Sequence, residues 1–217
     1  MYAFYSRAAV AGITTLFAMN YLAHLLLASH SEEAMLGALL GDFVKAGAIN
    51  AFEPAIAREI IIHRRIDSFT DGHAVNRRAR LHFSAKERRF AGILLDVFYD
   101  HVLSLKWDSY CSTPLVDFVQ QFYVLLRRHE PILPDNLLSI LPYFVERNWL
   151  CRYHNLSGVA LAIQGISQHL SKNGEHLAGG VSVLARDYTH FCQCFEAFFP
   201  ELVEFVNLER QKIENLP

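Results

Sequence analysis

The sequence has few cysteines, little net charge and no obvious linker. Its four cysteines (Cys111, Cys151, Cys192 and Cys194) form no CxxC pair, which argues against a zinc knuckle or c-type haem and favours ordinary reduced thiols. The formal net charge of −2 excludes a nucleic-acid binder that acts through bulk positive charge. No repeat, low-complexity tract or Gly/Ser-rich stretch divides the 217 residues, so we expect one working domain.

The apolar segments also lack the period-two alternation that is typical of strands. Hydrophobic residues make up 52% of the chain and fall mostly in long segments, which predicts an all-α, single-domain helical bundle. Pro54 suits a first helical turn, and Pro200 should kink or split the last helix. We expect helices over residues 20–30, 32–46, 54–71, 85–107, 114–128, 135–150, 156–171 and 175–207.

The first eighteen residues differ from the rest of the chain. Arg7 and the apolar run "AAVAGITTLFA" resemble a short signal peptide. Asn20 and His24 interrupt the run, however, and both are costly in lipid. Met19 opens the motif "MNYLAHLLLASH", so we expect residues 1–18 to be an extension and residues 19–217 to be the working domain. The sequence therefore predicts a cytoplasmic protein without stable membrane association.

The stretch "HRRIDSFTDGH" brings charge into an apolar helix. His63 and Asp67 are four residues apart and share one helical face with isoleucines, and Asp71 continues the row. A row of charges among isoleucines is not expected on a solvated helix face. A buried ion pair between His63 and Asp67 would, however, explain the row equally well. Arg64 flanks this face and could clamp a phosphate oxygen. Arg65 points nearly opposite, where pairing with an acid elsewhere in the fold is at least as good an interpretation.

Other apolar helices carry similar inward groups. Asp96 and Asp100 are again four apart, His101 follows at once, and Asp42 and His24 interrupt two further apolar runs. Each could singly be a satisfied core residue. Converging carboxylates repel one another, and a divalent cation removes the conflict. Mixed His/Asp donors suit Mn²⁺, Mg²⁺, Fe²⁺ or Zn²⁺, and the absence of a thiolate argues against a structural zinc.

The motifs "MNYLAHLLLA", "GALLGDFVK", "HRRIDSFTD" and "LLDVFYDHVL" resemble, in order, those of the acyl carrier protein phosphodiesterase family. The family is a divergent relative of the all-helical HD-domain phosphohydrolases. The resemblance implies Mn²⁺-favoured hydrolysis of the phosphodiester between 4′-phosphopantetheine and a carrier-protein serine. One departure is that no adjacent His-Asp doublet occurs. The resemblance implies a metal shell of His24, Asp42, His63, Asp67, Asp100 and His101, catalytic roles for Asp67, Asp71, Arg64 and Arg65, and support from Asp96.

Residues 76–89 form a basic run, with six basic residues against one glutamate. Such runs are usually solvated, but this one comes directly after the candidate site and could dock an acidic carrier protein. The residues expected to bind this partner are Arg77, Arg78, Arg80, Arg88 and Arg89.

Two other functions fit the same residues. One is an HD-type hydrolase of a nucleotide or another small phosphoester, and the other is a helical binding protein whose inward acids are vestigial. The phenylalanine-rich segment after Asp187 is expected to pack in the core, because aromatic stripes are ordinary core material.

Overall fold

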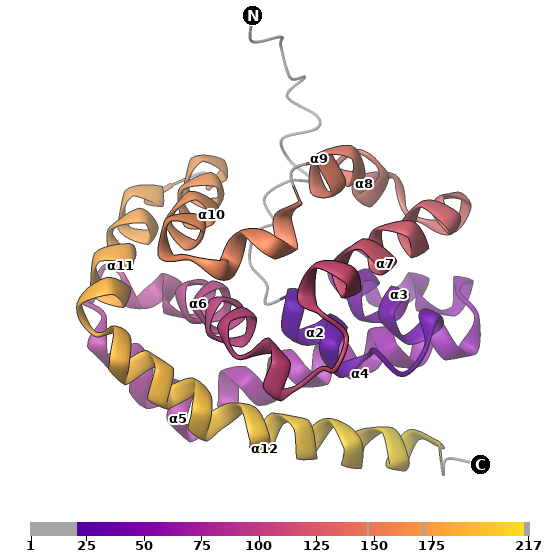
Figure 1. Ribbon diagram of the computed structural model, residues 1–217, viewed down its shortest axis with the longest axis horizontal. Coiled ribbons are helices and arrows are strands. Elements are labelled where there is room, and N and C mark those ends of the chain that lie inside the picture. The colour runs from indigo at the N-terminus through magenta and orange to yellow at the C-terminus, as the bar shows by residue number, and fades with distance from the viewer. Residues whose placement is uncertain (1–20, 147, 171, 215–217) are drawn as a thin grey trace, which may run out of the picture.

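A computed structural model describes residues 21–146, 148–170 and 172–214, and no strand occurs in these ranges (Figure 1). The prediction of an all-α domain is confirmed. The predicted extension, residues 1–18, lies outside the described residues. The α-helices are α2 (Tyr21–Leu27), α3 (Glu32–Leu40), α4 (Pro54–Gly72), α5 (Ala74–Ala79), α6 (Ala91–Leu105), α7 (Leu115–Arg128), α8 (Asp135–Leu138), α9 (Leu141–Glu146), α10 (Leu156–His169), α11 (Gly174–Arg186) and α12 (Tyr188–Glu214).

Short 3₁₀ helices connect several of these elements. They are η1 (Ala46–Ala51), η2 (Arg80–His82), η3 (Arg88–Phe90), η4 (Trp107–Ser109), η5 (Glu130–Ile132) and η6 (Trp149–His154). The helix expected over residues 85–107 is therefore shorter, because η3 and a turn replace its first residues. The helix expected over 32–46 ends at Leu40, and Asp42 lies in the turn after it.

Two helices are divided at positions other than those predicted. The helix expected over 135–150 is divided into α8, α9 and η6, because Pro142 has no N–H with which to continue α8 and Asn148 adopts a left-handed conformation at φ 45°. The last predicted helix breaks at Asp187 and not at Pro200, since α12 continues through the proline. A proline costs a helix one hydrogen bond, and here the core contacts of α12 outweigh that loss.

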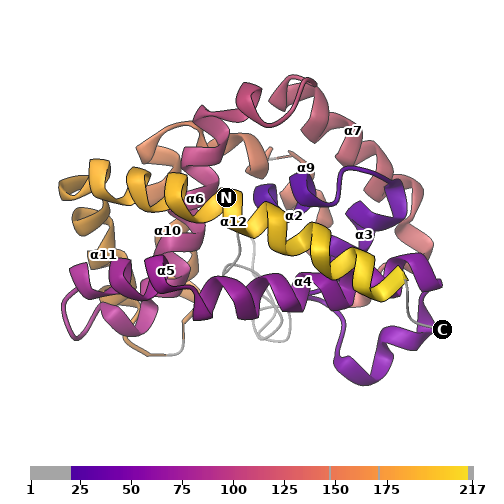
Figure 2. The same cartoon turned by 90° about the horizontal axis from the view of Figure 1, so that it is seen from below.

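Helix α6 runs through the centre of the core, and its residues from Val97 to Ser104 are all buried. It contacts α2, η6, α10, α11 and α12. The phenylalanines of α12 that were expected in the core are there, with Phe191, Phe195, Phe198 and Phe199 each at most 1% exposed. Helix α12 lies along α4 and α5, as Figure 2 shows.

Two glycines allow α3 to approach α4 closely. A Cβ on Gly37 would lie 2.5 Å from the Ile56 carbonyl oxygen, and one on Gly41 would lie 2.2 Å from Cγ of His63. Because these glycines are four residues apart, both face α4. This close packing brings the turn after α3, with Asp42, onto the His63 face of α4.

Candidate metal centre

Three elements bring four of the predicted ligands together. His24 lies on α2, Asp42 lies in the turn after α3, and His63 and Asp67 lie one turn apart on α4. Both histidines are 1% exposed, whereas the Asp67 side chain is 39% exposed. The centre is therefore buried on the histidine side and reaches solvent at Asp67.

The side chains are in mutual contact. The imidazole rings of His24 and His63 stack with centroids 4.0 Å apart. The Nε2 of His24 lies 3.3 Å from Asp67 Oδ1, and the Nε2 of His63 lies 3.4 Å from both Asp67 Oδ2 and Asp42 Oδ1. Donor atoms of His24, His63 and Asp67 all lie within 4.8 Å of one another. The shared helical face inferred from the sequence thus becomes a cluster of nitrogen and carboxylate donors.

Several atoms of the cluster lack a hydrogen-bond partner. They are both ring nitrogens of His24, Nε2 of His63 and Oδ2 of Asp42, and all are buried. The other nitrogen of His63, Nδ1, donates to the Ala38 carbonyl at 2.6 Å, which fixes the ring and turns Nε2 toward the carboxylates. Buried polar atoms without partners are costly, and a divalent cation would engage them. The residues present therefore fit a divalent metal.

Charge is distributed unevenly between the two histidines. Burial lowers the pKa of His24, and the neighbouring His63 lowers it further. Burial also acts to lower the pKa of His63, but the carboxylates of Asp42 and Asp67, each 3.4 Å from its Nε2, outweigh burial and raise that pKa to about 10. Burial acts to raise the pKa of Asp67, yet both histidines together hold it well below its ordinary value. The raised pKa places a proton on His63 between two carboxylates.

Asp100 and His101 do not join the cluster. The two oxygens of Asp100 accept hydrogen bonds from the backbone N–H groups of Leu22 (2.9 Å) and Ala23 (3.0 Å). Burial outweighs these donors and raises the pKa of Asp100 to about 8. His101 donates from Nδ1 to the Tyr153 carbonyl at 2.6 Å, and its Nε2 lies 2.9 Å from the Tyr188 hydroxyl. Asp100 thus holds the first turn of α2, and His101 joins α6 to η6 and α12; the assignment of both residues as metal ligands stays a prediction.

The two candidate phosphate arginines have different surroundings. Arg64 donates to the Val44 carbonyl, at the turn that carries Asp42, so it stays beside the centre. Arg65 pairs with Glu209 of α12, as in the structural alternative considered for it. Helical position separated the two arginines, but it could not identify Glu209, because this acid is 144 residues away from Arg65.

Asp71 and Asp96 extend the acidic surface next to Asp67. Asp71 pairs with Arg80, whose Nη2 would lie 3.6 Å from a Cβ placed on Gly92 of α6. Asp96 is partly buried, and burial together with the charges of Asp67 and Asp71 raises its pKa well above the ordinary value. Arg80, assigned to partner binding from the sequence, therefore lies at the edge of the site.

The rest of the basic run lies on α5, η2 and η3, directly after the helix that carries His63 and Asp67. Arg77 and Arg78 are exposed. Arg88 donates to the Phe83 carbonyl, and Arg89 lies 5.0 Å from the Phe90 ring centroid. The exposed cations nearest in sequence to the site helix are therefore Arg77 and Arg78.

The residue that sequence reasoning missed is Gly41. It adjoins Asp42, and any side chain at this position would meet the His63 ring. The available signal was the pair of small residues Gly37 and Gly41 at helical spacing, which is typical of close helix contact.

The fold and the cluster define a helical domain with a buried histidine–carboxylate centre suited to a divalent metal. Comparison with known proteins identifies the family. A family model for acyl carrier protein phosphodiesterase matches residues 19–202, so the chain belongs to this family.

Curated relatives agree over most of the chain. An acyl carrier protein phosphodiesterase of Yersinia enterocolitica is 37% identical over 188 residues, which is 85% of this chain and 96% of the relative. That of Serratia proteamaculans is 35% identical over 187 residues, covering 86% and 96%. One from Escherichia coli is 36% identical over 154 residues, covering 69% and 78%. No solved structure matches, so the likeness to HD-domain folds stays a prediction.

Within the part of the chain that the structure describes, every helix is too short or too polar to cross a bilayer. The cytoplasmic location and the absence of stable membrane association remain predictions.

Proposed function

We propose that the protein hydrolyses the phosphodiester that joins 4′-phosphopantetheine to a serine of holo-acyl carrier protein, releasing the apo-protein. Family membership supports the reaction class. The observation that carries the proposal is the gathering of His24, His63 and Asp67 from two separate helices around unpartnered buried atoms. A purely structural ion pair would not need two stacked histidines against one carboxylate, with buried nitrogens that make no well-formed hydrogen bond.

His24, His63 and Asp67, with Asp42 beside them, would hold the cation, for which Mn²⁺ is the first choice and Mg²⁺, Fe²⁺ and Zn²⁺ are alternatives. When bound, such an ion activates water and neutralises charge on phosphoryl oxygens. Asp67 forms the exposed side of the centre, so the phosphodiester would approach there. Arg64, held at the Val44 carbonyl, would steady a phosphoryl oxygen.

Asp96 is our candidate for the proton donor to the serine oxygen that leaves. A leaving alkoxide needs a proton, and a carboxyl group can supply it at neutral pH only if its pKa is raised. Burial and the acids of α4 raise the pKa of Asp96 in this way. Asp71 would keep Arg80 against α6, at the same edge of the site.

The direct test is to incubate the purified protein with holo-carrier protein and Mn²⁺ and to follow the mass of the carrier. We expect loss of the phosphopantetheine group with the wild-type chain. His63→Ala, Asp67→Ala and Asp42→Ala should each abolish this loss while circular dichroism stays helical. Near-full activity in all three variants would refute the site, and an unchanged carrier mass with wild type would refute the substrate.

Docking through the basic run separates this proposal from a hydrolase of small phosphoesters. Because Arg80 is paired with Asp71, the test uses Arg77→Glu and Arg78→Glu together. We expect a raised KM for the carrier protein, stronger at low salt, and little change with a small synthetic phosphodiester. Arg127→Glu is the matched control, since Arg127 is exposed on α7, away from α5 (Figure 1). Equal effects of the two changes on the carrier would contradict docking at α5.

A further inference from the structure

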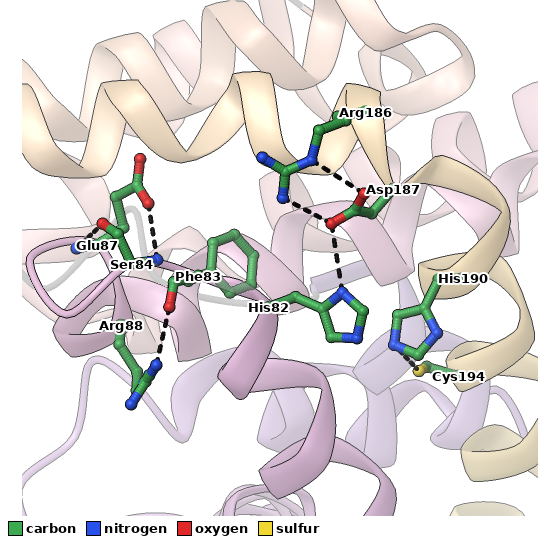
Figure 3. Close-up of polar contacts among 9 residues, drawn as sticks. All are labelled: His82, Phe83, Ser84, Glu87, Arg88, Arg186, Asp187, His190 and Cys194. Atoms are coloured by element: carbon green, nitrogen blue, oxygen red, sulfur yellow. Dashed lines mark hydrogen bonds and ion pairs between the residues drawn. The ribbon is translucent and has the colours of Figure 1, made fainter.

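A second group of metal-ligating side chains lies outside the centre described above. It consists of His82 of η2, Asp187 between α11 and α12, and His190 and Cys194 of α12 (Figure 3). His82 and His190 stack with ring centroids 3.9 Å apart and an interplanar angle of 20°. The Nε2 of His190 lies 3.5 Å from Sγ of Cys194. Two imidazoles and a thiol thus form a continuous row between η2 and α12.

Asp187 sets the tautomer of His82. Its Oδ2 accepts from Nδ1 of His82 at 3.3 Å, and Arg186 holds the same carboxylate through Nε at 3.0 Å and Nη2 at 2.7 Å. A histidine with Nδ1–H bound to a carboxylate presents the lone pair of Nε2, which is the usual arrangement behind a metal-binding imidazole. The contact with Asp187 therefore leaves Nε2 of His82 as the nitrogen that is available to a metal.

His190 and Cys194 are four residues apart on α12, so both side chains project from one helical face. This is the spacing at which a helix offers two donors to one ion. Burial, and then the nearby His82, lower the pKa of His190. Burial raises the pKa of the Cys194 thiol, so an ion would have to displace that proton.

We propose that His82, His190 and Cys194 form a second metal site, for a borderline ion of the Zn²⁺ or Co²⁺ type, with Asp187 positioning His82. A nitrogen and sulfur donor set selects such ions over Mn²⁺ and Mg²⁺, which favour oxygen. The site would tie η2, within the basic run, to α12. It is independent of the proposed activity, because it shares no residue with the first centre.

The three donors are not yet gathered around one point. Among the described residues, a three-donor group within 4.8 Å occurs at His24, His63 and Asp67 alone. His82 is the residue that must move, and its side chain is 38% exposed, whereas Cys194 is 7% exposed within α12. Binding therefore rotates His82 toward His190 and Cys194 and leaves α12 in place.

Cobalt titration of the full chain distinguishes this site from the first one. Thiolate bound to Co²⁺ gives intense near-ultraviolet charge-transfer absorption, which the sulfur-free first centre cannot produce. We expect this absorption in the wild type and in Asp67→Ala, and its loss in Cys194→Ser. Cys192→Ser is the matched control and should keep the band. Cys192 is two residues from Cys194, so the two thiols project from nearly opposite faces of α12.

Two further variants keep the test decisive if Cys194→Ser is poorly folded. Asp187→Asn should weaken Co²⁺ binding about 10- to 100-fold, as expected when the carboxylate behind a ligating imidazole is lost. His82→Gln, at a partly exposed position, should weaken it at least as much. A band that survives in Cys194→Ser, or Co²⁺ affinity for the sulfur site unchanged in His82→Gln, would overturn the proposal, as would no band in the wild type.

Discussion

The proton on His63 should make the proposed binding of a divalent metal strongly dependent on pH. Nε2 of His63 faces carboxylate oxygens of Asp42 and Asp67, both at 3.4 Å. These contacts overcome burial and raise the pKa of the imidazole to about 10. A cation that uses Nε2 must displace this proton, because only the neutral ring is a ligand. We therefore predict that metal binding at neutral pH releases one proton from this site.

The magnitude of the effect comes from the pKa of His63. At pH 7 the ring is about three units below its pKa of about 10, so deprotonation costs about 4 kcal/mol of the intrinsic binding energy. The apparent Kd for Mn²⁺ should fall about tenfold for each unit of pH rise between about pH 6.5 and 8.5. Isothermal titration calorimetry in buffers of different ionisation enthalpy measures both the slope and the proton count.

A specific result would refute proton release from His63. A Kd that stays constant over this range, with a binding heat independent of the buffer, would mean that no proton leaves the imidazole. A control is Asp42→Asn, which removes one of the two charges that stabilise the imidazolium. In that variant the number of protons released at pH 8.5 should fall, because the pKa of His63 then lies closer to the pH of the assay.

Three other predictions concern the frame around the centre. Gly41→Ala places a Cβ 2.2 Å from the His63 ring, so we expect turnover to fall about a hundredfold. Gly47→Ala is the control, because a Cβ there meets nothing within 4 Å and should leave turnover unchanged. Similar turnover rates in the two variants would contradict the contact between Gly41 and His63. Asp100→Ala should lower the unfolding free energy in urea by about 1–3 kcal/mol for each of the two backbone N–H groups it orphans, and an unaltered midpoint would contradict this. When no metal is added, the raised pKa of His63 contributes its full stabilisation of the fold below about pH 6.5. This contribution to the unfolding free energy should decline as the pH rises toward about 10. The His63→Ala variant, also without added metal, should lack that decline.

Some of this structure could be predicted from local sequence and some could not. Helix α4 was predictable because its start at Pro54 and its apolar periodicity are local, and helical spacing gives the His63–Asp67 row. The position of Asp42 was not, since it lies in a turn whose direction depends on the contact between Gly41 and His63. The contact of Asp100 with the backbone of α2 could not be predicted either. An inward carboxylate looks the same in sequence whether it binds a metal or two backbone N–H groups.

The helix breaks depend on contacts that are distant along the chain. Pro200 weakens α12 locally, but buried residues on both sides, Phe198 and Phe199 before it and Leu202 and Val206 after it, keep the helix continuous. The actual break, at Asp187, places a carboxylate next to Arg186 and His82. His82, which this carboxylate contacts, is more than a hundred residues away, so no local sequence pattern could predict the break.

The last turns of α12 lie beyond residue 202, where the family match ends, yet they are fastened to the helix that carries His63 and Asp67. Arg210 contacts both oxygens of buried Glu59 at 2.9 Å. Deleting that guanidinium would leave an anion without its counter-charge, at a cost of about 3–5 kcal/mol. Trimming the chain to the boundary of the family match would therefore remove this anchor and loosen the helix that carries His63 and Asp67, far from the cut.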